Sequence, residues 1–104
     1  MKYRVVYLDE AKLDLKDIVA YLAQYYKSTA RAFKEKVAER VNALKEWPLM
    51  CQVYALDPYF RQMVVGDYLL FYSVDEEKRL VAIHRIVHQK RDASKVILTR
   101  RPLE

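Results

Sequence analysis

Three strands are predicted by residues 60–92, which read FRQMVVGDYLLFYSVDEEKRLVAIHRIVHQKRD. Runs rich in β-branched, aliphatic and aromatic residues cover 60–65, 68–74 and 80–92, and the last run ends in a basic segment. Gly66-Asp67 predicts a two-residue hairpin turn, in which glycine supplies the positive φ. Residues 75–78 supply the second turn. We therefore expect a three-stranded antiparallel meander in the second half of the chain.

The first half predicts one strand followed by two helices. Residues 3–8 are rich in β-branched and aromatic residues and predict a strand. Asp9 is a candidate N-cap for the first helix, Ser28 or Thr29 for the second, and Pro48 ends the second. Apolar residues recur at helical spacing in two stripes. The stripes are Ala11, Leu15, Ile18, Leu22 and Tyr25, and then Ala30, Phe33, Val37, Val41, Leu44 and Trp47.

This order of elements predicts an α+β fold. Two or three residues join the helices, so the helices form an antiparallel hairpin. The hairpin is expected to pack on one face of a mostly antiparallel sheet. With 104 residues, the chain is expected to form a single domain over 1–104, of which 93–104 is a basic tail.

The strand at 68–74 is apolar on both faces, as in a central strand that is covered on both sides. Tyr68 and Tyr72 lie on one face, and Leu69 and Phe71 lie on the other. Because two helices cover only one face, the opposite face is expected to present apolar surface to a partner. The alternative is that the loop at 49–58 and the C-terminal tail fold back over it.

Charge and composition restrict the setting of the protein. The net charge is +5, and residues 84–104 carry +4 of it. Charge alone fits a nucleic-acid or acidic protein partner and a merely solvated tail equally well. One cysteine excludes an internal disulfide and favours a reducing compartment. No apolar run approaches about 18 residues, so we expect a cytoplasmic protein without a membrane anchor.

The polar residues of the last strand suggest two chemistries, metal binding and metal-free RNA cleavage. His84 and His88 are four residues apart and are expected on one face of a strand. Zinc needs three or four ligands, and Cys51 would be the only soft addition, so neither metal nor cofactor is expected. Most of the nine tyrosines fall on core stripes, which favours packing over base stacking for Tyr21 and Tyr72.

Metal-free RNA cleavage is the second chemistry. It needs a base for the 2′-hydroxyl, cations for the phosphorane charge and an acid for the leaving oxygen. The candidates are Arg61, His84, Arg85, His88, Lys90 and Arg91. The structural alternatives are equally plausible: a salt bridge from Arg85 to a helix carboxylate, and a polar place at the sheet edge for His84.

The pattern resembles the RelE/ParE superfamily of type II toxin–antitoxin toxins over residues 1–92. The resemblance rests on Ala11, Asp14-Leu15, Ile18, Trp47-Pro48, Phe60-Arg61, Gly66, Phe71-Tyr72, Arg85-Ile86-Val87-His88 and Arg91-Asp92. It implies a growth-inhibiting toxin that is neutralised by the C-terminal segment of an antitoxin. The residues Tyr68, Leu69, Phe71 and Tyr72 are then the expected antitoxin contacts.

The resemblance leaves two targets, and the residues favour one. RelE-like members cut mRNA on the ribosome and carry an Arg where this chain has Leu69, two alternating Lys where it has Arg61 and Met63, and an aromatic near the C-terminus, where it has none after Tyr72. The chain is more similar to the ParE branch, whose members poison DNA gyrase. The expected target contacts are Arg61 and the basic end from Arg85 to Arg101, with Arg85, His88, Lys90 and Arg91 as its principal members. The alternatives are a ribosome-dependent mRNA endonuclease and a binding module that has lost toxicity.

Overall fold

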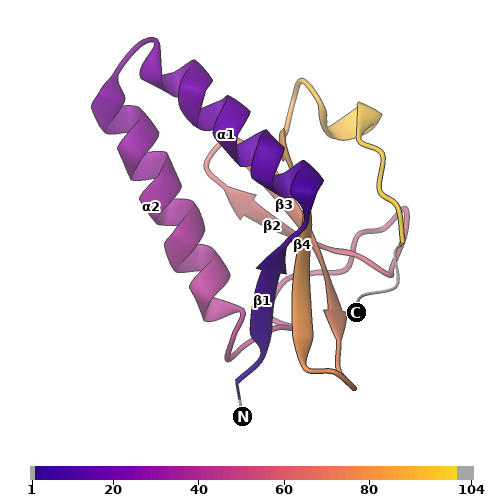
Figure 1. Ribbon diagram of the computed structural model, residues 1–104. Helices are drawn as coiled ribbons and strands as arrows, with labels where there is room; N and C mark the ends of the chain where they lie inside the picture. The colour runs from indigo at the N-terminus through magenta and orange to yellow at the C-terminus, as the bar shows by residue number, and fades with distance from the viewer. Residues whose placement is uncertain (1, 101–104) are drawn as a thin grey trace.

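Two layers make up the structure, a computed structural model that describes residues 2–100: a helical hairpin and a four-stranded sheet (Figure 1). The hairpin consists of α1 (Asp9–Ala23) and α2 (Lys27–Ala43). The sheet consists of β1 (Arg4–Tyr7), β2 (Arg61–Val65), β3 (Tyr68–Asp75) and β4 (Leu80–His88), in the order β1-β4-β3-β2. A 3-10 turn, η1 (Ala93–Lys95), follows. The predicted α+β fold is confirmed.

The sheet is mixed, because β1 runs parallel to β4, whereas β2, β3 and β4 form the predicted antiparallel meander. The α1–α2 hairpin carries the chain from the edge strand β1 to the opposite edge at β2 and covers one face of the sheet on the way (Figure 1). Gly66 has φ of +60°, as its turn requires. No helix within residues 2–100 is long and apolar enough to cross a membrane.

The helix starts differ from the prediction by one residue for α1 and by two or three residues for α2. α1 begins at Asp9 itself, so this carboxylate lies in the first turn, where it faces the positive end of the helix dipole. α2 begins at Lys27, ahead of the predicted caps Ser28 and Thr29. Neither helix has a side-chain cap hydrogen bond. The short connections that precede α1 and α2 therefore fix where the two helices begin, and no capping side chain takes part.

The main core lies between the hairpin and the sheet. Val37 and Val41 of α2 pack in one cluster with Leu70 and Tyr72 of β3, and all four are buried. Trp47, expected to close the α2 stripe, is instead 64% exposed, because the helix ends at residue 43 and the chain turns away. The stripes therefore predict the core correctly as far as the helices extend.

Tyr72 fastens the loop after α2 to the sheet. Its hydroxyl donates a 2.9 Å hydrogen bond to the Pro48 carbonyl, and the ring is fully buried. Burial raises the pKa of the Tyr72 phenol, which keeps the donor protonated. Replacing Tyr72 by Phe should lower the free energy of unfolding by about 1–2 kcal/mol, because a buried carbonyl loses its partner. Urea denaturation measures this loss, with the exposed Tyr26→Phe as the control that should change nothing.

The second face of the sheet is covered as well. Phe60 and Phe71 are fully buried there, and the ring of Tyr54 packs on Phe71 at a centroid distance of 4.9 Å. The C-terminal segment reaches the same loop, where Arg100 forms an ion pair with Asp57 (Figure 1). The expectation of an open apolar face is therefore wrong, and the alternative, in which loop and tail fold back, describes this face.

A bulge in β4 overturns the predicted placement of the two histidines. Arg85 pairs with Phe71, but Ile83 pairs with Tyr72, so His84 is an extra residue between them. The bulge reverses the alternation of side chains beyond it. His84 consequently packs with Phe60 and Ser73 on the second face, whereas His88 packs with Tyr68 on the helix side. The expectation that both histidines share a face is wrong.

Candidate functional site

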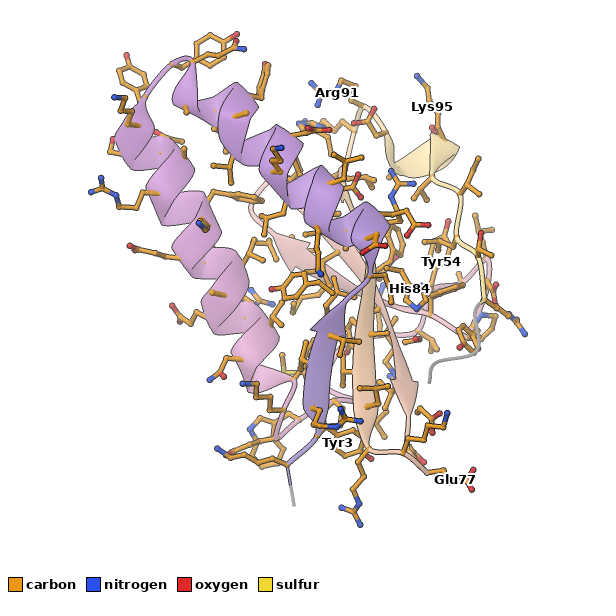
Figure 2. All side chains as sticks on the ribbon, viewed as in Figure 1. Tyr3, Tyr54, Glu77, His84, Arg91 and Lys95 are labelled. Atoms are coloured by element: carbon orange, nitrogen blue, oxygen red, sulfur yellow. The ribbon has the colours of Figure 1, made fainter. Side chains whose placement is uncertain are left out.

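His84 is part of the second core. It is 4% exposed, its Nε2 lies 2.8 Å from the Ser73 hydroxyl, and its ring meets Phe60 edge to face at 4.9 Å. Burial lowers the pKa of His84 to about 4. The structural alternative, a place for His84 at the sheet rim, is therefore wrong, because its partners Ser73 and Phe60 belong to the second core. Figure 2 shows it apart from Arg91 and Lys95, which lie together near η1.

Arg61 is held by the loop that precedes its strand. Its Nη1 donates to the carbonyls of Cys51, at 2.7 Å, and Leu49, at 3.4 Å. Arg61 pairs with Tyr72, whereas His88 pairs with Tyr68. Four residues along β3 separate these positions by roughly 13 Å. The structure therefore does not bring Arg61 to the last-strand candidates.

Arg85 makes the predicted salt bridge to a helix carboxylate. Its Nε and Nη2 donate to Asp14 of α1 at 2.7 and 3.2 Å, and the Ile86 amide donates to the same carboxylate at 3.0 Å. The hydrogen bond that Arg85 donates to Asp14 raises the pKa of Arg85, so the guanidinium stays charged. This one carboxylate joins α1 to the strand just beyond the bulge. The structural alternative for Arg85 is confirmed.

His88 lies at the end of β4 and accepts hydrogen bonds from the backbone of the segment that follows it. Its Nδ1 accepts hydrogen bonds from the amides of Lys90 and Arg91, both at 3.2 Å. These donors assign the proton of the neutral ring to Nε2. His88 therefore offers an N–H donor to a ligand, and no free lone pair that would accept a proton from a 2′-hydroxyl.

A groove of about 480 Å³ lies between α1 and the segment that follows β4; we call it the mixed-charge groove. Tyr21 and Tyr68 line it as aromatic walls, and the Arg91 guanidinium lies 5.8 Å from the Tyr21 ring centroid. Its lining holds as many acidic as basic residues. The acids are Asp14, Asp17 and Asp92, and the bases are Arg85, Arg91 and Lys95.

Two members of this groove on α1, Asp17 and Tyr21, are not candidate site residues in the sequence analysis. Tyr21 was assigned to core packing, but it is 44% exposed. The missed signal is a second stripe on α1, in which positions 14, 17, 18 and 21 share a face beside the predicted core stripe. Within residues 2–100, no three His, Cys, Asp or Glu side chains are placed to hold a metal ion.

The sequence matches one protein family over most of its length. The family is described as the ParE toxin of type II toxin–antitoxin systems, and its model matches residues 3–93. Comparison with curated protein sequences gives no match.

Solved structures of toxin–antitoxin proteins have similar folds. A chain of the RelBE2 complex of Mycobacterium tuberculosis is 23% identical, with 85% of this chain and 99% of that chain covered and a TM-score of 0.61. A chain of the chromosomal ParDE system of P. aeruginosa is 15% identical, with 84% and 96% covered and a TM-score of 0.71. A chain of the RelE–RelB complex of Pyrococcus horikoshii OT3 is 19% identical, with 88% and 99% covered and a TM-score of 0.63. At these identities the likeness shows the fold.

Proposed function

Because the chain belongs to the ParE family of toxins of type II toxin–antitoxin systems, we propose that it arrests growth by binding DNA gyrase through the mixed-charge groove. In this proposal the toxin acts in the cytoplasm, where gyrase works, and its cognate antitoxin blocks it. The toxin contributes a docking surface and breaks no bond in its target.

The dispersal of the candidate catalytic residues is the observation that carries this proposal. His84 is buried against Ser73, Arg61 is held by loop carbonyls, and Arg85 is paired with Asp14. His88 has its Nδ1 occupied by two backbone amides. Cleavage of RNA without a metal needs a base with a free lone pair within hydrogen-bond reach of the 2′-hydroxyl. His84 is 4% exposed and the Nδ1 of His88 is occupied, so neither histidine presents such a base at the surface in this arrangement.

The charge balance of the mixed-charge groove also favours a protein target. A surface for RNA presents excess positive charge to the phosphates, because release of counterions supplies much of the affinity. Here Asp14, Asp17 and Asp92 offset the three basic residues. Aromatic and arginine side chains beside a partly apolar pocket are typical of the hot spots of protein–protein interfaces.

Within the groove, the exposed side chains are the proposed target contacts. They are Arg91 and Lys95, with Tyr21 beside them. The half-buried His88 of the groove and the exposed Lys90 just outside it, at the adjoining strand end, complete the proposed contacts. Arg61 and Arg85 were also predicted as contacts, and we propose instead that they hold the loop and the bulge in place. The predicted contact region ended at Arg101, which lies outside the described residues.

The Arg91→Glu, Lys95→Glu double variant tests this assignment. It should raise the concentration needed to inhibit gyrase supercoiling by about 30-fold, because truncation or reversal of a hot-spot pair costs about 2 kcal/mol of binding free energy. Lys36→Glu reverses a charge on α2 outside the groove and should leave inhibition unchanged.

The ribonuclease alternative is tested with the same purified protein by measuring cleavage of mRNA. The backbone amides of Lys90 and Arg91 both donate to His88 Nδ1, so these three residues lie together at the strand end, and this observation keeps the alternative. Cleavage of mRNA on programmed ribosomes, abolished by His88→Ala, together with no effect on gyrase, would contradict the proposal. Absence of both effects would favour the non-toxic binding module.

A further inference from the structure

The segment from residue 93 to residue 100 runs from η1 to the loop that covers the second face of the sheet, and we call it the strap (Figure 1). Its extended part alternates between inward and outward positions: Val96 and Leu98 are half-buried, whereas Ile97 and Thr99 are exposed. Within residues 2–100, no backbone–backbone hydrogen bond includes residues 96–99. Two half-buried side chains and the attachments at its two ends therefore hold the middle of the strap.

The first end of the strap is attached to the end of β4. The Asp92 amide donates to the His88 carbonyl, and the Lys95 amide donates to the Asp92 carbonyl, both at 3.0 Å. Lys95, Val96 and Ile97 then line the mixed-charge groove. The strap is therefore the wall of this groove that lies opposite α1.

The second end of the strap is attached to the loop through Arg100. Its Nε and Nη2 donate to the Asp57 carboxylate at 3.3 and 2.5 Å, and its guanidinium lies 5.0 Å from the centroid of the Tyr59 ring. The hydrogen bond from Arg100 lowers the pKa of the Asp57 carboxyl, which favours the charged pair. We call Asp57, Tyr59 and Arg100 the latch. None of these three residues lines the mixed-charge groove.

The loop side of the latch is fixed to the second core. The Asp57 carboxylate also accepts the Tyr59 amide at 3.2 Å, and the Asp57 carbonyl accepts the Phe60 amide at 3.0 Å. The Tyr59 ring meets the fully buried Phe60 edge to face at 4.9 Å. Tyr54 donates its amide to the Phe60 carbonyl and packs on Phe71. Breaking the latch would therefore free the strap and leave the loop in place.

The latch is too exposed to matter much for the stability of the whole fold, but it is strong enough to place a short segment. The Arg100 side chain is 61% exposed. An exposed ion pair together with a cation–π contact changes an equilibrium by about 5- to 10-fold. The fold depends on its two cores, whereas closure of the strap has only Val96 and Leu98 besides the latch. A factor of this size therefore acts mainly on the strap.

We propose that Asp57 and Arg100 are positioning residues for the mixed-charge groove, because the latch they form holds the strap closed as the wall opposite α1. The inference rests on the proposed function in taking this groove as the target surface. A target that binds only the closed groove has an apparent affinity proportional to the closed fraction. The latch thus acts through the position of Lys95 and through the shape of the wall, without touching the target.

Mobility of the strap is measured on the full chain, without a target, by ¹⁵N relaxation. In the unmodified protein the order parameters of residues 96–99 should be about 0.85, as in rigid backbone. Arg100→Asp places a second carboxylate beside Asp57 and should lower them below about 0.6. The urea midpoint should stay unchanged, since neither core is altered. Order parameters that stay high in Arg100→Asp, or that are already low in the unmodified protein, would overturn the proposal.

An exchange of the two charges separates the latch from the net charge. Arg100→Asp and Asp57→Arg change the net charge in opposite directions, yet both should free the strap. The double variant Asp57→Arg, Arg100→Asp restores an ion pair and should recover part of the lost order, though not all, because the Tyr59 amide loses its acceptor. Arg31→Asp makes the same substitution at an exposed position of α2 and should leave the strap closed. Loss of order in Arg31→Asp as large as in Arg100→Asp would contradict the latch.

Inhibition of gyrase supercoiling supplies the functional readout. Arg100→Asp should raise the inhibitory concentration at least about threefold at an unchanged urea midpoint, and the double variant should recover part of the loss. Arg31→Asp should inhibit as the unmodified chain does. A mobile strap with unchanged inhibition would overturn the positioning role. Failure of the unmodified chain to inhibit gyrase would instead contradict the proposed target alone, since the mobility of the strap is measured on the free protein.

Discussion

Replacing Asp14 by alanine is expected to lower the free energy of unfolding by about 3 kcal/mol. Asp14 accepts hydrogen bonds from Arg85 Nε at 2.7 Å, from Arg85 Nη2 at 3.2 Å and from the Ile86 amide at 3.0 Å. Alanine would leave a guanidinium and an amide without their partner in a mostly buried place. Breaking a buried pair costs about 3–5 kcal/mol, and the side-chain exposures of 17% for Asp14 and 28% for Arg85 place the effect at the lower end.

Urea denaturation at neutral pH measures this effect, and two variants control it. Asp17→Ala removes an exposed carboxylate one turn further along α1 and should change stability by less than about 0.5 kcal/mol. Arg85→Met combined with Asp14→Ala should recover part of the loss, because the uncompensated charge is removed. Equal losses for Asp14→Ala and Asp17→Ala would show that the pair does not hold α1 to β4.

The second large expected effect is a loss of folding stability at acidic pH, and its cause is His84. Burial lowers the pKa of His84 to about 4, whereas an unfolded chain titrates near about 6.5. Above pH 6.5 the ring is neutral in both states, so its contribution is fully present. Between these values the unfolded chain takes up a proton that the folded chain does not. Stability should therefore fall by about 2 kcal/mol at pH 5 and by about 3 kcal/mol below pH 4.

His84→Gln isolates this contribution from other titrating groups. Glutamine retains a partner for the Ser73 hydroxyl but carries no titrating group in this range. The variant should be less stable at pH 7, because its side chain fills the site less well, yet its stability should change little between pH 7 and pH 5. A pH dependence equal to that of the unmodified chain would assign the acid sensitivity to other groups. Denaturation midpoints at several pH values provide the measurement.

The order and type of the elements follow from local signals in the sequence. The hairpin turn at Gly66 and the helical stripes depend only on neighbouring residues, and the structure contains both, although α2 ends at Ala43, ahead of the predicted stop at Pro48. The paired faces of β3 are also as predicted, because side chains alternate along a regular strand. These signals sufficed for the fold, and the family match agrees with the resemblance.

Contacts between distant segments decided the site. The bulge at His84 depends on pairing with β3, and it moved one histidine into the second core, away from the other. Tyr21 and Arg91 meet only because α1 packs beside the end of β4.

By itself, then, the sequence determined the layers, the turns, the main core and the charge of the C-terminal end. Tertiary structure alone decided which polar residues meet, which face is covered and where the mixed-charge groove forms. The physical reason is range: periodicity and turn chemistry act over a few residues, whereas a bulge, a loop that folds back or an ion pair such as Asp14–Arg85 joins residues many positions apart.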